Sequence, residues 1–149
     1  MKPFKITPPI YLLIAIIFVI VLHFFLPGMI LIPWPWTLLG IIPVVAGIAI
    51  NLSADQTFHR AETTVYPFDM PSALVTYGPY RFTRNPMYLG FVLILIGVVV
   101  LLGSLTPFLV VLAFWLLLDR LFINLEEENL ALKFVARWDM YKSRTRRWL

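Results

Sequence analysis

Two groups of polar residues in the 149-residue chain have the types and spacing needed for chemistry. The first group is a loop segment at residues 77–90, which is rich in Gly, Pro, aromatic and Arg residues. Gly78-Pro79 and Asn85-Pro86 restrict the backbone there, so Arg81 and Arg84 would be presented rigidly. Such a loop can bind an anion and stack on a planar ring. The same composition also fits a cationic membrane anchor with interfacial tyrosines.

The second group is acidic. Asp119 and Arg120 follow an apolar segment, and Glu126, Glu127 and Glu128 come next on the same expected helix. Because helical residues seven apart share a face, we expect Asp119 and Glu126 on one face. One interpretation is a polar pocket whose carboxylate captures a cationic group of a ligand. The alternative is that Arg120 reaches the interface with Asp119 as its counter-ion, while the glutamates pair with Lys133 or Arg137 in solvent.

Other reactive groups are few. His59 is expected near the end of the second apolar segment and is a candidate base, although a lone interfacial histidine is more often simply solvated. With no cysteine and two histidines in the sequence, we expect no metal site. The chain also lacks the G-x-S-x-G, P-loop and G-x-G-x-x-G motifs.

The elements that must position these groups are hydrophobic. The sequence is 60% hydrophobic and 13% charged, whereas soluble domains are about 25% charged. Residues 6–54 and 85–118 contain no Asp, Glu, Lys or Arg. Stretches of this length predict an all-α fold, an integral membrane helical bundle with about four transmembrane helices and a helical cytoplasmic tail.

Proline and glycine set the predicted boundaries. We expect a single domain over residues 1–149, with a cytoplasmic loop at 55–85, a cytoplasmic tail at 126–149, and spans at residues 10–26, 36–54, 86–103 and 107–125. Small residues recur every seven positions in the second and third spans, which predicts faces for close helix packing. These residues are Gly40, Gly47, Ala54, Gly90 and Gly97.

The distribution of Lys and Arg predicts the topology. Lysines occur near the N-terminus, arginines in the central loop and both in the tail, whereas the other two connections have neither. The positive-inside rule then places both termini and the loop in the cytoplasm of a multi-pass protein, by default in a bacterial-type inner membrane. A short turn after residue 103 would make the last two spans an antiparallel hairpin, which brings residues 81–88 close to residues 119–128. Positive charge beside hydrophobic segments reports topology, so we expect no nucleic-acid partner.

Both polar groups match motifs of a known family. The pattern G-P-[YF]-x-x-x-R-[NH]-P-x-Y-x-G is present in full at Gly78, Pro79, Tyr80, Arg84, Asn85, Pro86, Tyr88 and Gly90. A second pattern that begins E-E-x-x-L is met by Glu126, Glu127, Leu130, Phe134, Tyr141 and the final Arg147-Trp148-Leu149. Residues 63–68 also look like the loop before the first motif in small bacterial members. The sequence therefore resembles the isoprenylcysteine carboxyl methyltransferase and phospholipid N-methyltransferase group of integral membrane methyltransferases.

The resemblance has three departures. Val135 stands where the family has Gly, Trp138 where it has Tyr, and Arg146 where Pro is common. The change at Val135 predicts a helix that continues past Phe134 instead of turning.

The resemblance implies methyl transfer from S-adenosylmethionine to a lipophilic acceptor, a carboxylate or an amine, at the cytoplasmic membrane face. Its implied partners are the lipid bilayer and a lipophilic small-molecule or lipid substrate that arrives from the bilayer. The implied cofactor-binding residues are Tyr77, Gly78, Tyr80, Arg84, Asn85, Pro86, Tyr88, Leu89, Gly90, Glu126 and Glu127. Catalytic candidates are Arg84, Glu127 and His59, and substrate-binding candidates are Asp119, Arg120, Arg81 and Tyr141.

Two other classes stay open from the sequence. One is a membrane reductase of related fold that uses a nicotinamide cofactor. The other is a non-catalytic membrane scaffold that has kept the same helices.

Overall fold

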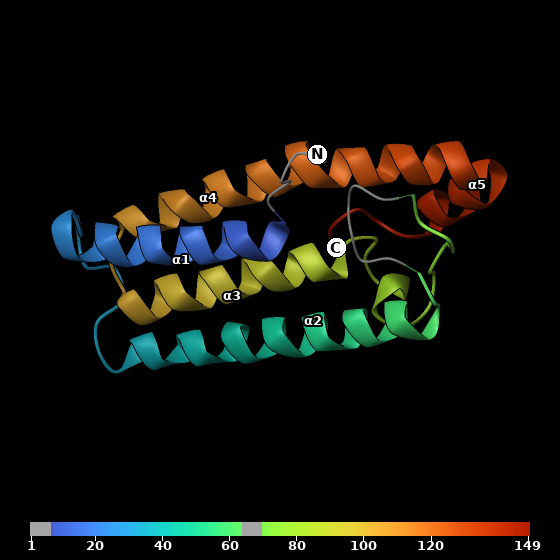
Figure 1. The fold of residues 1–149 in the computed structure, drawn as a ribbon. Coiled ribbons are helices and arrows are strands. Elements are labelled where there is room, and N and C mark those ends of the chain that lie inside the picture. The colour runs from blue at the N-terminus through green and yellow to red at the C-terminus, as the bar shows by residue number, and fades with distance from the viewer. Residues whose placement is uncertain (1–6, 64–69) are drawn as a thin grey trace.

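The computed structural model describes residues 7–63 and 70–149, and it forms an elongated bundle of helices (Figure 1). The helices that lie along the bundle are α1 (Pro8–Phe25), α2 (Ile41–Arg60), α3 (Pro86–Leu102) and α4 (Thr106–Leu118). A 3-10 turn, η1 (Trp36–Gly40), leads into α2, and a second, η2 (Gly78–Arg81), precedes α3. A π-helical turn, η3 (Asp119–Ile123), joins α4 to α5 (Asn124–Arg144). The sequence resemblance at residues 64–68 lies outside the described residues.

The helices have the length and composition of membrane spans. Three stretches qualify, Pro8–Phe25, Trp36–Arg60 and Thr106–Arg144, and α3 is a shorter apolar helix of 17 residues. No strand occurs among the described residues, where one isolated bridge joins Ile30 to Ser104. The prediction of an all-α membrane bundle is confirmed. Charged residues recur from Asp119 and become frequent in α5, so we treat this helix as the part of the last stretch that extends beyond the membrane.

Small residues hold α2 and α3 together. The carbonyl oxygen of Gly90 lies where it would be only 2.5 Å from a Cβ atom on Gly47, and the carbonyl of Gly40 has the same relation to Gly97. Any larger residue would therefore push the two backbones apart. The predicted seven-residue packing faces are confirmed, and they meet each other between antiparallel helices.

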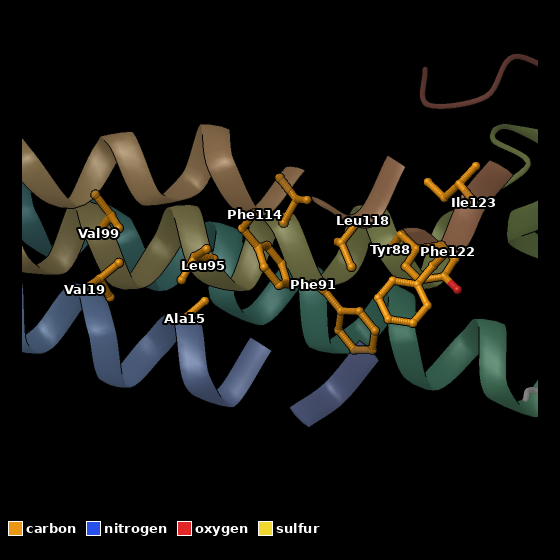
Figure 2. Packing of buried hydrophobic residues seen from close by; sticks show 11 residues of the cluster. Ala15, Val19, Tyr88, Phe91, Leu95, Val99, Phe114, Leu118, Phe122 and Ile123 are labelled. Atoms are coloured by element: carbon orange, nitrogen blue, oxygen red, sulfur yellow. The ribbon is translucent and has the colours of Figure 1, made fainter. Parts of the chain in front are cut away.

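The main hydrophobic core lies between α1, α3 and α4 (Figure 2). Val19 of α1, Leu95 and Val99 of α3, and Leu118 of α4 are fully buried there. Towards one end of the bundle the core gains aromatic side chains, because Phe91, Phe122 and Tyr88 lie there beside Leu118 and Ile123.

At the other end, the α1–α2 connection packs on the α3–α4 turn. Leu31 donates its backbone N–H to Gly103 at 2.8 Å, and Leu105 donates to Met29 at 2.9 Å. Gly103 ends α3 in a left-handed conformation with φ of 74°, which glycine adopts without strain. The short turn makes α3 and α4 the antiparallel hairpin expected from the sequence, so the loop before α3 and the helix after α4 emerge at the same end.

The path of the tail corrects a prediction. The helix does not continue unbroken past Phe134, because Val135 has φ of 31° and ψ of −103° and breaks α5 there. After the break the chain doubles back towards the bundle (Figure 1). Positive φ is strained for a β-branched residue. The backbone therefore keeps the turn that a glycine would favour, although the side chain is unsuited to it.

Candidate active site

The loop before α3 is fixed by contacts with α2 and α5. Tyr80 of η2 is buried, and its ring packs edge-on against Phe58 of α2, with ring centres 5.0 Å apart. Tyr141 of α5 donates its hydroxyl to the Tyr80 carbonyl at 2.7 Å. Gly78 turns with φ of 64° and lies against Thr57, where a Cβ atom would be 3.0 Å from the hydroxyl oxygen. The loop is therefore held on both sides.

A buried ion pair joins this loop to α5. Arg84 donates from Nε to Glu127 Oε1 at 3.0 Å, and its Nη2 lies 2.9 Å from the same oxygen. Only 8% of the Arg84 side chain and 10% of the Glu127 side chain are exposed. Nη1 of Arg84 donates to the carbonyl of Thr145 at 2.7 Å, and the guanidinium lies over the ring of Trp138 at 5.7 Å. All three guanidinium nitrogens of Arg84 thus have a partner, and these contacts fix the position of its positive charge.

A second arginine engages the other oxygen of Glu127. Nη2 of Arg147 donates to Glu127 Oε2 at 2.6 Å, and its Nη1 lies 3.3 Å from both oxygens of Asp119. Nη1 also donates to the side-chain oxygen of Asn124 at 3.0 Å. The hydrogen bond with Glu127 raises the pKa of Arg147 above its ordinary value. Glu127 is consequently neutralised by two arginines, one on each oxygen.

The π-helical turn changes which acidic residues share a face. A π turn inserts about one extra residue into the helical register. An unbroken helix predicted that Asp119 and Glu126 would lie on one face. Instead, Asp119 lies on the same side as Glu127, eight positions later, and both pair with Arg147. The counter-ion of Asp119 is also Arg147 instead of the neighbouring Arg120, whose side chain is exposed.

The C-terminal residues form part of the site. Arg84 donates its backbone N–H to the carbonyl of Arg146 at 2.9 Å. The carbonyl of Arg147 accepts from the Thr83 hydroxyl and from the Asn85 side-chain amide, each at 3.0 Å. Trp148 then donates its indole N–H to Asp119 at 3.1 Å. The end of the chain is therefore tied to the loop before α3 and to the π-helical turn.

Glu126 has a different environment from Glu127. It accepts a hydrogen bond from the Tyr88 hydroxyl at 2.7 Å, and within residues 7–63 and 70–149 the structure gives it no cationic partner. Burial raises the pKa of Glu126 to about 7, and the charge of Glu127 adds to the rise, although the Tyr88 hydrogen bond opposes it. The two adjacent carboxyl groups therefore have different roles. Glu127 is held in ion pairs, whereas Glu126 can gain or lose a proton near pH 7.

Both glutamates face one cavity of about 290 Å³. Its wall is mainly apolar and aromatic, and its charged groups are Arg84, Glu126 and Glu127. The cavity also reaches the start of α1 at Thr7, Pro8 and Pro9. Eight of the residues implied by the sequence resemblance line it, namely Tyr80, Arg84, Asn85, Pro86, Tyr88, Glu126, Glu127 and Tyr141.

The remaining candidates lie elsewhere. Tyr77 and Arg81 are exposed, and Gly78 packs on Thr57. Leu89 and Gly90 belong to α3 without lining the cavity, and Gly90 serves the packing of α3 on α2. The largely exposed His59 is 3.4 Å from Asp55 on the same helix and does not line the cavity either.

Sequence reasoning missed several residues of this site. Phe58, Phe91, Asn129 and Trp138 line the cavity without having been assigned a ligand, and Arg147 is the second partner of Glu127. The basic-aromatic end was visible as a motif, but its distance from the glutamates along the chain hid the contact. No group of three or more potential metal ligands occurs among the described residues.

The chain belongs to the phospholipid methyltransferase family, whose profile matches residues 36–137, more than half of its length. Membership makes this multi-pass membrane protein a methyltransferase by family, with a membrane lipid as the indicated class of substrate. No curated protein and no solved structure shows a significant match to the chain.

Proposed function

We propose that the protein transfers a methyl group from S-adenosylmethionine to the amine of a membrane lipid, at the end of the bundle that holds the cavity. One observation carries the proposal. The loop before α3 and the first turn of α3 meet the start of α5, distant in sequence, across one cavity through the Arg84–Glu127 ion pair and the Tyr88–Glu126 hydrogen bond.

The described residues fit the chemical groups of S-adenosylmethionine. Its amino-acid end carries one carboxylate and one ammonium, which are complementary to the paired charges of Arg84 and Glu127. Its sulfonium and adenine suit aromatic surfaces, and Tyr80, Tyr88 and Trp138 line the cavity. When bound, this cofactor supplies a methyl group on a positively charged sulfur, which leaves with its bonding electron pair.

The acceptor class follows from the charges that remain. A carboxylate acceptor would meet no second cation among the described residues of the cavity wall, because Arg84 is the one cation there and is assigned to the carboxylate of the cofactor. An amine acceptor would meet Glu126, which has no such partner among the described residues. An ammonium group must lose a proton before its nitrogen can form a bond to the methyl carbon, and Glu126 is positioned to take that proton. The N–C bond then forms as the methyl–sulfur bond breaks.

Isothermal titration calorimetry on detergent-purified protein tests the cofactor assignment. We expect S-adenosylmethionine to bind to the wild type, and Glu127→Gln to weaken binding at least about 10-fold, because the variant loses the charge that holds the ammonium and Arg84. Glu128→Gln is the matched control, since Glu128 is exposed next to the site. No binding by folded wild type would overturn the proposal, and binding of a nicotinamide dinucleotide instead would assign the reductase class.

A methyl-transfer assay tests the acceptor. Radiolabelled methyl groups from S-adenosylmethionine should appear in phosphatidylethanolamine and not in a fatty acid presented in the same micelles. Glu126→Gln should lose most turnover while it retains cofactor binding, because Glu126 acts on the acceptor. Labelling of the fatty acid alone would show that the acceptor is a carboxylate. A wild type that binds the cofactor but methylates neither lipid would refute the amine-lipid assignment.

A further inference from the structure

An apolar groove runs along the outside of α1 and α4, separate from the cavity just described. Its volume is about 460 Å³. It extends from Tyr11 to Leu26 on α1, and from Leu117 back to Thr106 on α4. Apart from the hydroxyl groups of Tyr11 and Thr106, its walls are hydrocarbon or aromatic. Alanines at positions 15 and 113 leave the space that larger side chains would fill.

The surroundings and dimensions of the groove restrict its occupant. Both walls are apolar helices of a membrane protein, so hydrocarbon and not water is the medium beside them. From Tyr11 to Leu26 the helix rises about 22 Å, which exceeds the depth of one leaflet in a core about 30 Å thick. The volume spread over this length gives a mean cross-section of roughly 20 Å². A single extended hydrocarbon chain fits in a groove of this cross-section.

A row of three aromatic rings connects the wall of the groove to the wall of the cavity. Tyr11, in the groove wall, packs edge-on against Phe122 with ring centres 5.4 Å apart. Phe122 stacks on Tyr88 at 6.3 Å, and Figure 2 shows these two rings next to each other. Tyr88 lines the cavity and donates to Glu126. The same row of contacts thus leads from the membrane-facing groove to the proton-accepting carboxylate.

We propose that the α1–α4 groove binds one acyl chain of the acceptor lipid, so that the headgroup of that lipid reaches the cavity beside Tyr11, Phe122 and Tyr88. This proposal rests on the proposed function, because an acceptor anchored in the bilayer must bring its amine to Glu126. The groove holds the chain, and the headgroup enters the cavity at the Tyr11 end of the groove, where the cavity reaches Pro8 and Pro9.

Photo-crosslinking in lipid nanodiscs tests the groove without requiring turnover. The probe is phosphatidylethanolamine with a diazirine in its palmitoyl chain, and labelled residues are mapped by mass spectrometry. We expect labelling to concentrate on the groove walls, around Ile14, Phe18 and Leu109, above the level on the lipid-facing side of α2. Ala113→Trp should fill the groove and reduce this labelling at least about fivefold, and Ala113→Leu should reduce it less. Ala49→Trp, at an exposed alanine on α2, is the matched control.

The outcomes separate this proposal from the cofactor assignment. Equal labelling of the groove and of α2, or groove labelling that survives both Ala113 substitutions, would overturn the groove. A wild-type dimer that Ala113→Trp dissociates would also overturn it, and would assign the groove to a second copy of the chain. Groove labelling in a protein that fails to bind S-adenosylmethionine would support the lipid site and refute the methyltransferase chemistry. Normal binding of S-adenosylmethionine together with equal labelling of the groove and of α2 would support the cofactor assignment and refute the lipid site.

Discussion

Tyr88 donates a 2.7 Å hydrogen bond to Glu126, across 38 positions of the chain, and so links the first turn of α3 to the first turn of α5. This contact leaves Glu126 as a carboxyl group held in place by a neutral donor. The adjacent Glu127 is held by two arginines. The difference between these neighbours gives the site a fixed charge and a titratable one.

The titration of Glu126 predicts how turnover depends on pH. Burial raises its pKa from 4.5 to about 7, so below neutrality the carboxyl group already carries a proton and cannot take one from an ammonium. We therefore expect kcat/KM for phosphatidylethanolamine to rise about 10-fold from about pH 6 to about pH 8. Glu126→Gln should be slow and should lose this rise. A wild-type profile that is flat over the same range, with intact cofactor binding, would contradict the role of Glu126.

Arg147 should strengthen cofactor binding although it does not line the cavity. It holds Oε2 of Glu127 and thereby fixes the carboxylate that faces Arg84. We expect Arg147→Met to weaken S-adenosylmethionine binding about 5- to 10-fold, about 1 kcal/mol, because one third of the Arg147 side chain is exposed and solvent screens the pair. Arg146→Met is the control, since only the backbone carbonyl of Arg146 contacts Arg84. Equal losses in both variants would show that the tail acts only through its fold.

His59 should be dispensable. The structure places it largely exposed on α2, beside Asp55 and outside the cavity wall. His59→Ala should therefore leave both cofactor affinity and the rate of methyl transfer within about twofold of wild type. A loss of turnover without a loss of cofactor binding would restore this residue as a catalytic candidate.

The sequence predicted most of the fold because membrane helices require long uncharged segments, which are easily recognised in a sequence. Uncharged stretches marked the apolar helices, and glycines at intervals of seven marked the α2–α3 contact. The register of the acidic residues could not be predicted, because a π turn changes it. Residues 119–123 contain no proline or glycine that would indicate such a turn in the sequence. The role of Arg147 was hidden for a related reason: the break at Val135 returns the tail to the site, and a valine does not signal a break.

Close packing of α2 on α3 should make Gly47 intolerant of larger residues. A Cβ atom at this position would lie 2.5 Å from the carbonyl oxygen of Gly90, so neither backbone can accommodate it without moving. We expect Gly47→Leu to lower the free energy of unfolding by about 1–3 kcal/mol, measured by thermal or denaturant unfolding in detergent. Ala49→Leu, two positions away on an exposed part of α2, should change it by less than about 0.5 kcal/mol. Similar effects of both substitutions would argue against this helix contact.

The strained backbone at Val135 predicts a stabilising substitution. With φ of 31°, Val135 has a conformation that glycine tolerates far better than a β-branched residue does. Its side chain is 62% exposed, so Val135→Gly loses little burial while it removes a strain of about 1–3 kcal/mol, part of which the greater freedom of glycine in the unfolded chain offsets. We expect a net gain of about 1 kcal/mol in thermal unfolding. Leu132→Gly, at an exposed position on the regular part of α5, should instead destabilise by about 1 kcal/mol. If both glycines destabilised the protein alike, α5 would be continuous in solution, and the tail would not return to Glu127.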